Sequence, residues 1–396
     1  MGVDVVIVGG GLAGASLAAA LAHSGLRLAL IERKAPSVPP REWDSRIYSL
    51  TPASTAFLRG VDAWDRMEAG RSTPIYEMHV FGDDGRSRLD FSAYESGVSE
   101  LATTVESGRL HYALWQGLQR QRNLSLLCPA TPSGLIARSD SVEIMLSDGG
   151  SVSARLAVGA DGADSWLRRA AGIESTTESY GQQGLVANFS CGRPHRGAAY
   201  QWFRRDGVLA FLPLPDQRIS IVWSTPDDHA GELLALPAAE FCRRVSAASG
   251  EVLGGLELIT PPAAFPLGRL SARSMIQSRI ALAGDAAHVV HPLAGQGINL
   301  GFGDARSLAG LLSDARDPGD RLLLRRFERS RAEDTLALRW VTDGLFRLFE
   351  LRHPIAARIR NLGLNLTNSN AVIKTLLARR ATGVGGSFIG RKHHDF

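Results

Sequence analysis

One stretch near the N terminus, VDVVIVGGGLAGASLAAALAHSGLRLALIER, limits what this chain can fold into. An apolar run at residues 3–8 predicts a buried strand, small residues predict a helix as far as Ser24 and Gly25, and a second apolar run at residues 28–31 ends at Glu32. The turn between the first strand and the helix carries GxGxxG, so the whole stretch predicts a βαβ unit that binds a dinucleotide. The alternative is a glycine-rich turn that serves packing only.

Each glycine of this turn has a separate physical purpose. Gly9 allows the tight turn, Gly11 lets the backbone approach a pyrophosphate, and Gly14 permits the helix to pack closely on the strand. The free N–H groups at the start of the helix attract phosphate. Glu32 is placed to accept hydrogen bonds from a ribose. The strand, helix and acid therefore lie where dinucleotide binding needs them.

A different pattern follows along the chain. Residues 75–92 and 181–225 alternate as antiparallel strands do, with turns such as Asp83-Asp84-Gly85. Further elements are expected as helices at residues 110–120, 304–313 and about 320–350, and as two strands within residues 142–160. We therefore predict an α/β fold, in which a Rossmann-like domain is interleaved with a mostly antiparallel β-sheet domain and followed by C-terminal helices.

These patterns divide the chain into four parts. The Rossmann-like, cofactor-binding domain is expected over residues 1–74, 100–180 and 270–320, and the β-sheet substrate domain over residues 75–99 and 181–269. Residues 321–382 are expected to form a C-terminal helical region, and residues 383–396 a flexible tail.

The composition excludes several classes of protein. The longest apolar runs fall short of the roughly 20 residues that a membrane-spanning helix needs. The N terminus has no basic region or cleavage site of a signal peptide, so we expect a cytoplasmic protein. The three cysteines, Cys128, Cys191 and Cys242, are far apart in the chain and are expected to be small buried side chains rather than disulfide or zinc ligands.

Two more glycine-rich turns follow apolar strands. Residues 158–168 read VGADGADSWLR, and residues 284–301 read GDAAHVVHPLAGQGINLG. In the first, Asp161 and Arg168 could be only a surface ion pair. In the second, a carboxylate that leaves a buried strand suits a polyol, and backbone N–H groups at a helix start favour the negative charge of a reduced isoalloxazine ring. One glycine-rich turn for a pyrophosphate and one for such a ring together indicate FAD.

The histidines of the third turn have three interpretations. With Asp285, His288 and His291 could be metal ligands, but no third histidine or cysteine is near in the sequence, so we expect no metal. They could be structural histidines with satisfied hydrogen bonds, or His291 could tune protonation at the ring. The aromatic pairs Trp202/Phe203 and Phe211/Trp223 are expected in the core, or alternatively along an apolar substrate pocket.

The motifs GGGLAG with Glu32, GADGADSWLR and GDAAHVVHPLAGQGINLG resemble, in order and spacing, the three fingerprints of the single-component flavoprotein aromatic hydroxylases, the class of para-hydroxybenzoate hydroxylase. More narrowly, DSRIYSL at residues 44–50, AFLPL at residues 210–214 and HPLAGQGINLG resemble the ubiquinone-biosynthesis hydroxylases. The resemblance covers about residues 3–380. It implies an enzyme in which FAD, reduced by NAD(P)H, reacts with O2 to a C4a-hydroperoxide that hydroxylates the ring of a polyprenylated phenol.

The resemblance also implies roles for individual residues. The ADP half of FAD is expected to contact Gly9, Gly11, Gly14 and Glu32. Further contacts with the cofactor are expected from Leu12, Ala13, Arg33, Arg46, Asp161, Gly162, Gly284, Asp285, Gly297, Ile298 and Asn299. The surroundings of the flavin ring are expected to consist of Pro292, Gly295, Gln296 and Gly297. No side chain is expected to act as a nucleophile, because the cofactor carries the chemistry. Arg46 could alternatively be only a surface charge.

The C-terminal part of the chain is basic. From Arg339 to the end there are ten lysines and arginines against three acids. Two packed helices with solvated basic faces would explain this, as would contact with the inner face of the cytoplasmic membrane or with a ubiquinone-biosynthesis complex. We expect no nucleic acid partner. Two other functions stay open: a hydroxylase of a small soluble phenol or secondary metabolite, and a non-catalytic FAD-binding assembly or redox-sensing protein.

Overall fold

The computed structural model describes residues 1–84, 86–290, 297–333, 367–368 and 374. Its centre is a six-stranded sheet in the order β19-β20-β12-β1-β2-β8. These strands are Ile276–Gln277, Ile280–Leu282, Leu156–Gly159, Val5–Val8, Leu28–Ile31 and Leu124–Leu127. All neighbours are parallel except β19 and β20, and the inner strands β1, β2 and β12 are fully buried, as sheets covered on both faces require.

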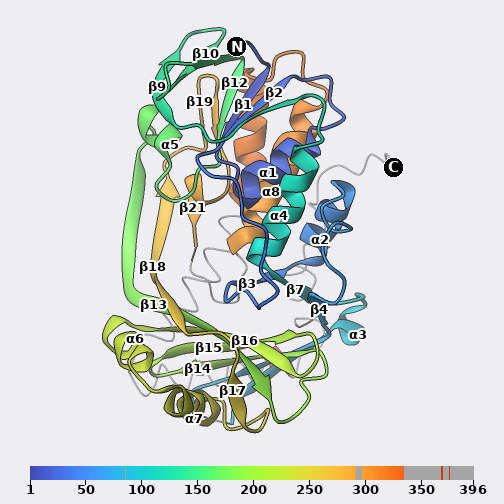
Figure 1. Ribbon diagram of the computed structural model, residues 1–396, viewed down its shortest axis with the longest axis vertical. Helices are drawn as coiled ribbons and strands as arrows, with labels where there is room; N and C mark the ends of the chain where they lie inside the picture. Colours follow the sequence, from blue (N-terminus) through green and yellow to red (C-terminus); the bar gives the residue numbers. More distant parts are fainter. Residues whose placement is uncertain (85, 291–296, 334–366, 369–373, 375–396) are drawn as a thin grey trace.

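Helices cover one face of the central sheet and a small sheet covers the other. Helices α1 (Leu12–Ala20), α4 (Ser107–Leu118) and α8 (Gly297–Leu312) lie side by side on the first face (Figure 1). The second face carries β9 (Pro132–Ala137), β10 (Val142–Leu146) and β11 (Ser151–Ala154), with α5 (Trp166–Ala170) beside them. The apolar residues between these layers form two of the buried cores.

Most of a nine-stranded sheet lies in the lower half of the molecule in Figure 1, and one edge of the sheet extends into the upper half. It runs β21-β18-β13-β16-β15-β14-β5-β6, with β17 also paired to β13. In that order the strands are His288–Val289, Ala263–Ala272, Ser175–Cys191, Arg218–Pro226, Gly207–Leu214, Ala198–Arg204, Glu77–Phe81 and Arg88–Ser92, and β17 is Leu256–Leu258. Every pair is antiparallel except β5 with β14, so the sheet is mostly antiparallel as predicted.

The remaining elements pack on the two faces of this large sheet. Helices α6 (Asp227–Leu234) and α7 (Ala238–Ala248) cover the outer face, where Phe211 and Trp223 are buried and Trp202 is partly buried. The core interpretation of these aromatic residues is thus confirmed. On the other face lies a three-stranded sheet of β3 (Ile47–Leu50), β7 (Ala102–Glu106) and β4 (Ser72–Ile75). Helices α2 (Pro52–Gly60) and α3 (Ala93–Ser96) follow β3 and β6.

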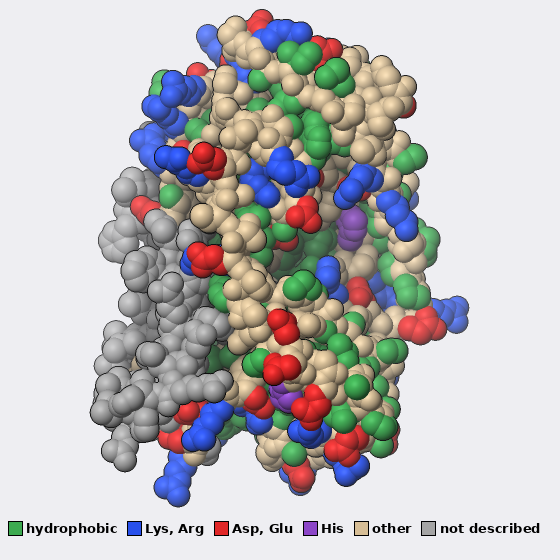
Figure 2. Space-filling view, turned by 90° about the vertical axis from the view of Figure 1, so that its left-hand side faces the viewer, with side chains coloured by type: hydrophobic (Ala, Val, Ile, Leu, Met, Phe, Trp, Pro, Cys, Tyr) green, Lys and Arg blue, Asp and Glu red, His purple; other side chains and the backbone are tan. Residues whose placement is uncertain are grey.

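Long strands join the two halves. β13 and β18 pair along almost their whole length and run along one side of the molecule from the upper to the lower half (Figure 1). Figure 2 faces this side and shows acidic and basic side chains intermingled over the described residues. Because β13 begins at Ser175 and continues without a break to Cys191, it crosses the predicted boundary at residue 180. The domain limits stay a prediction.

Several local predictions differ in detail. α1 ends at Ala20, earlier than Ser24, because the chain leaves the helix in successive turns before Gly25. Residues 142–160 contain three strands rather than two, since β12 leaves the β10–β11 hairpin and joins the central sheet beside β1. The expected helix at about 320–350 is observed as helical residues 321–333, and the rest of it lies outside the described residues.

Candidate functional site

The β1–α1 turn is closed by backbone contacts. Gly9 has φ +100°, and a methyl group placed on it would lie 2.4 Å from the carbonyl oxygen of Ala160. A methyl group on Gly14 would lie 2.0 Å from the carbonyl oxygen of Gly9, so neither position accepts a side chain without moving the backbone. At Gly11 the same test meets no atom within 4 Å. The open side of the turn is therefore at Gly11, where a pyrophosphate has to approach.

The start of α1 completes this part of the site. Gly11 is the N-cap and no side chain caps the helix, so the N–H groups of the first turn, which includes Leu12 and Ala13, have no partner within the helix. Such groups bind phosphate. We call the Gly9–Gly14 turn together with α1 the phosphate end of the site.

Glu32 lies at the end of β2 as predicted, and in the structure it also supports the turn. Its carboxylate accepts hydrogen bonds from the N–H of Gly10 at 2.6 Å and from the N–H of Lys34 at 3.0 Å. A carboxylate accepts up to four hydrogen bonds, so capacity for a ribose hydroxyl remains. Arg33 is exposed to solvent beside it. Its contact with the cofactor stays a prediction.

The second glycine-rich turn follows β12 and packs against the first. Asp161 accepts a hydrogen bond from the N–H of Leu167 at 3.1 Å, while its other carboxylate oxygen is buried and has no partner among the described residues. Gly162 has φ +82° and open space where a side chain would be. A buried oxygen without a donor is costly, so this position suits the hydroxyl or amide donor of a ligand.

Arg168 connects the second turn to the third. The side chain is buried, and the guanidinium donates to the carbonyl oxygens of Ala163 at 2.7 Å and Ala286 at 2.8 Å. Burial lowers the pKa of Arg168, whereas Asp161 raises it. The interpretation of Asp161 and Arg168 as a surface ion pair is wrong, because Arg168 is not on the surface. It holds two turns together instead.

The third turn follows β20 and presents Asp285. Gly284 has φ +61° and begins a short 3-10 helix, η1 (Gly284–Ala286). Asp285 is reachable from solvent, yet the surrounding protein desolvates its carboxylate and raises its pKa, against the opposing effects of His288 and Arg46. The carboxylate is thus open to a ligand and can accept a hydrogen bond from a hydroxyl group. We call residues 284–290 with the first turn of α8 the ribityl end.

The ribityl end packs directly on the phosphate end. Methyl groups on Gly284 and Gly301 would lie 3.0 and 3.4 Å from the Cβ atom of Ala13 in α1. Gly297 and Ile298 begin α8, and the side chain of Asn299 donates to the carbonyl oxygen of Ser49 at 2.9 Å and accepts from the N–H of Thr51 at 3.0 Å. The start of α8 is thereby attached to β3. Pro292, Gly295 and Gln296, with His291, lie outside the described residues.

A hydrogen-bonded loop carries Arg46 to this site. The N–H of Arg46 donates to the Asp44 carboxylate at 2.9 Å, and the guanidinium lies 5.7 Å from the ring centre of Phe265. Asp44 is held by its own N–H, which donates to buried Glu106 at 2.8 Å, and by its carbonyl, which accepts from Asn188 at 2.8 Å. Arg46 is exposed and close enough to Asp285 to lower its pKa. Its position fits a residue beside a cofactor rather than an isolated surface charge.

His288 is a structural histidine in this structure. It is buried, and its Nε2 lies 2.8 Å from the Asp304 carboxylate. Burial works to lower the pKa of His288, but Asp304 outweighs burial and the pKa is raised. Among the described residues no group of three or more His, Cys, Asp or Glu side chains could hold a metal ion. The prediction of no metal stays a prediction, because His291 is not among these residues.

Sequence reasoning missed several residues of the site. His111 in α4 lies with Nε2 2.7 Å from the carbonyl oxygen of Gly10, and Asp304 and Arg331 form a buried pair behind the ribityl end. The sequence could have indicated Asp304, because it is the only acidic residue within α8. His111 and Arg331 gave no comparable signal, since His111 lies 101 residues from Gly10, which it contacts, and Arg331 lies 27 residues from Asp304.

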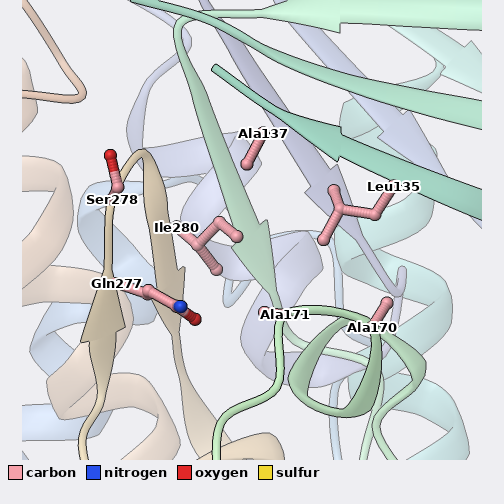
Figure 3. Close-up of a pocket in the computed structure, with 7 residues that line it drawn as sticks. All are labelled: Leu135, Ala137, Ala170, Ala171, Gln277, Ser278 and Ile280. Atoms are coloured by element: carbon pink, nitrogen blue, oxygen red, sulfur yellow. The ribbon is translucent and has the colours of Figure 1, made fainter. Parts of the chain in front are cut away.

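Another hollow of the surface does not belong to this site. Figure 3 shows it at the edge of the central sheet, with a volume of about 230 Å³. Its lining residues come from β9, α5 and the β19–β20 hairpin and are Leu135, Ala137, Ala170, Ala171, Gln277, Ser278 and Ile280. None of them is acidic or basic, and none is a predicted site residue. The described helices include none that is long and apolar enough to cross a membrane.

Known proteins resemble this chain in sequence. A family model described as an FAD binding domain matches residues 2–337. The chain is 37% identical over 387 residues to ubiquinone hydroxylase UbiL of Rhodospirillum rubrum, covering 96% of this chain and 89% of that protein. It is 33% identical over 389 residues to 3-demethoxyubiquinol 3-hydroxylase of Escherichia coli, covering 96% of this chain and 98% of that one.

Solved structures show the same fold. The crystal structure of pqsL, a probable FAD-dependent monooxygenase from Pseudomonas aeruginosa, superposes with a TM-score of 0.76 at 24% identity, covering 92% of this chain and 99% of that one. The structure of p-nitrophenol 4-monooxygenase PnpA from Pseudomonas putida gives a TM-score of 0.77 at 18% identity, with 96% and 98% covered. At these identities the likeness concerns the fold alone.

Proposed function

This chain belongs to the FAD-binding-domain family, and from that premise we propose that it is an FAD-dependent monooxygenase that hydroxylates the ring of a polyprenylated phenol or quinol in ubiquinone biosynthesis. The observation that carries the proposal is the meeting of three glycine-rich turns at one edge of the central sheet. Gly9 and Gly14 contact Ala160, Gly284 contacts Ala13, and Arg168 bonds to Ala286. One long cofactor can therefore touch all three turns.

The residues present fit FAD at both of its ends. At the phosphate end, the open side of Gly11 and the uncapped start of α1 accept a pyrophosphate. The oxygen of Asp161 that has no partner among the described residues and the exposed carboxylate of Asp285 can accept hydrogen bonds from hydroxyl groups of the cofactor. The buried Asp161 oxygen needs such a partner, which a bound cofactor provides.

The contribution of the protein to the reaction is binding and orientation. Bound FAD, reduced by NAD(P)H, supplies the activation of O2 and the transfer of one oxygen atom to the ring. Helix α8 begins at this end of the site, and Arg46 adds a positive charge beside Asp285, so the helix dipole and the cation favour negative charge there. Asn299 keeps the start of α8 fixed on β3.

The relatives of this chain support the choice of substrate. The proteins that resemble this chain over 96% of its length are named for hydroxylation of ubiquinone and demethoxyubiquinol. The apolar side chains Val186, Leu212 and Val222 on the inner face of the large sheet are buried against the β3-β7-β4 sheet, so the choice of substrate rests on the relatives alone.

Turnover with defined phenols tests this proposal. The purified protein should be yellow with extractable FAD, and a short-tailed prenyl phenol should stimulate NADH or NADPH oxidation and gain one oxygen atom by mass spectrometry. NADH and NADPH are assayed separately. A small soluble phenol serves as the comparison substrate. Faster turnover of the soluble phenol would overturn the proposal of a prenylated substrate. FAD binding without turnover of any phenol would overturn the proposal of an enzyme and favour an assembly or redox-sensing protein.

We further propose that the basic C-terminal region places the protein on the inner face of the cytoplasmic membrane, next to other enzymes of the same biosynthesis. The support is the excess of cations after Arg339 and a lipid-tailed substrate. Of these cations, Lys374 already pairs with Glu95 at 3.1 Å. Binding to vesicles with and without anionic lipid tests the proposal. Removal of residues 375–396 should reduce binding to anionic vesicles, and unchanged binding would contradict it.

A further inference from the structure

Asp304 is a fully buried carboxylate that no part of the proposed reaction uses. It lies in α8 and receives three hydrogen bonds. One oxygen accepts from the N–H of Gly284 at 2.9 Å and lies 2.8 Å from Nε2 of His288, and the other accepts from Nε of Arg331 at 2.7 Å. A buried charge with this many partners is stable only while all of them stay in place. The hydrogen bonds of Asp304 therefore fix three segments relative to one another: the Gly284–His288 turn, α8 and helical residues 321–333.

Two of the partners are the ends of the turn that presents Asp285. Gly284 precedes Asp285 directly and His288 follows it by three residues. Both bond to the same oxygen of Asp304, so the turn is held at its two ends by one group on α8. Asp304 lies about two helical turns from the start of α8 at Gly297. One side chain thus fixes the distance between Asp285 and the start of α8.

The third partner comes from the segment beyond α8. Arg331 belongs to helical residues 321–333, is buried, and also lies against Gly303, where a methyl group would come within 2.6 Å of the guanidinium. Its second contact with α8 is the carbonyl oxygen of Leu300 at 3.5 Å. Arg331 therefore balances the charge of Asp304 from the side opposite the turn.

A comparable carboxylate elsewhere shows what a purely structural network looks like. Asp317 accepts hydrogen bonds from the guanidinium of Arg279 at 2.5 Å and from the N–H of Gly319 at 3.1 Å, and it pairs with Arg155 at 3.3 Å. It has the same kinds of partners as Asp304, namely cations and a backbone N–H. None of its partners belongs to either end of the cofactor site. Asp317 is partly exposed, so D317N controls for the loss of a carboxylate with cationic partners outside the site, and not for the loss of a buried one.

We propose that Asp304 is the positioning residue of the ribityl end: it holds both ends of the Gly284–His288 turn on α8, so that Asp285 and the start of α8 keep the spacing that one FAD molecule requires. The inference rests on the proposed FAD site. Asp304 touches no cofactor itself and acts through Asp285. The phosphate end does not depend on it.

Binding of FAD and ADP to the full chain tests the inference. FAD affinity is measured by flavin fluorescence, and ADP affinity by calorimetry, for the wild type, D304N, D285A, the double variant D285A/D304N and D317N. Asp304→Asn should weaken FAD binding about 10- to 100-fold, the scale of a misplaced contact, while ADP binding stays unchanged. D317N should leave both affinities unchanged. The double variant should bind FAD as weakly as D285A alone, because Asp304 acts through Asp285.

The outcomes separate this inference from the proposed function. A wild type that binds ADP but not FAD would overturn the FAD site itself. FAD binding in D304N equal to the wild type, or independent losses in D285A and D304N that multiply in the double variant, would overturn only the role of Asp304. If D304N binds neither ligand because it does not fold, H288A decides: it removes the His288 donor to Asp304, so it releases one end of the turn and should weaken FAD but not ADP. Unchanged FAD affinity in H288A would then overturn the inference.

Discussion

The two ends of the cofactor site are built in different ways. At the phosphate end, glycines a few residues apart close the turn by backbone contacts, as the 2.0 Å approach of a Gly14 methyl group to the Gly9 carbonyl oxygen shows. At the ribityl end, side chains from distant segments hold the turn, with Asp304, His288 and Arg331 as the buried centre. At the phosphate end, a side chain on Gly9 or Gly14 would collide with the backbone. At the ribityl end, the strength of the contacts depends on the charges of the side chains and therefore on pH.

This difference has a consequence for cofactor binding. Most contacts that shape the phosphate end lie within its own βαβ unit, and Ala160 and His111 add contacts from outside it. The ribityl end takes its shape when α8, η1, β3 and residues 321–333 have all been brought together. We therefore expect substitutions at the phosphate end to act on folding or on phosphate binding, and substitutions at the ribityl end to act on stability in a manner that depends on pH.

The largest effect is expected for Gly14→Ala. The added methyl group overlaps the carbonyl oxygen of Gly9, and because both atoms belong to the backbone, the βαβ unit has to shift. We expect a loss of about 3 kcal/mol in the free energy of unfolding, together with loss of FAD binding. Urea unfolding measures the change in the free energy of unfolding. Gly25→Ala is the matched control, since a methyl group there meets no atom within 4 Å. Equal stability of the two variants would refute steric closure.

Gly11→Ala should separate binding from folding at the same turn. A methyl group there meets no protein atom within 4 Å, so the free energy of unfolding should change by less than about 0.5 kcal/mol. The same methyl group lies where the pyrophosphate approaches, and FAD should bind about tenfold more weakly, which corresponds to about 1.4 kcal/mol. Fluorescence titration with FAD gives the affinity. An unchanged affinity would mean that the phosphate does not pass Gly11.

Asn299→Ala tests the attachment of α8 at the ribityl end. The change removes the hydrogen bonds to the Ser49 carbonyl and from the Thr51 N–H. We expect a loss of about 1 kcal/mol in the free energy of unfolding. Thr51 also caps α2, and that bond to the N–H of Ser54 should remain. Equilibrium unfolding of the cofactor-free protein provides the measurement, and a stability equal to the wild type would show that the start of α8 is held by packing alone.

The smallest effect is expected from the pH dependence at His288. Asp304 raises the pKa of folded His288 above its ordinary value of 6.5. The ion pair therefore contributes its full stability below about pH 6.5 and loses it as pH rises through the folded pKa. His288 and Arg331 hold the pKa of Asp304 below its usual range despite burial, so Asp304 stays ionised throughout.

The test compares the wild type with H288Q in cofactor-free protein from about pH 6 to about pH 9. The stability advantage of the wild type should be largest at the acidic end and should shrink as pH rises. An advantage that grows with pH would mean that His288 is neutral in the folded protein, and that the ribityl end is not held by charge.

Much of the site could be predicted because its parts are local. The glycine turn, Glu32 at the end of the second strand, and an acid after each of the two later strands lie within short stretches whose spacing has a physical meaning. Asp161 and Asp285 are found where those stretches placed them, at turns that follow β12 and β20. The assignment to FAD followed from these local patterns, and the family match supports it.

Other features were decided only by the tertiary structure, because they depend on contacts between residues far apart in the chain. The burial of Arg168 follows from its bonds to Ala286 across 118 positions, and β12 joins β1 rather than the preceding hairpin. His288 was ambiguous until Asp304 was found beside it. The sequence by itself determined which short segments can surround FAD, since backbone sterics act between neighbours. Only the fold determined which buried charges hold those segments together, since a charge takes its partner from whichever segment packs against it.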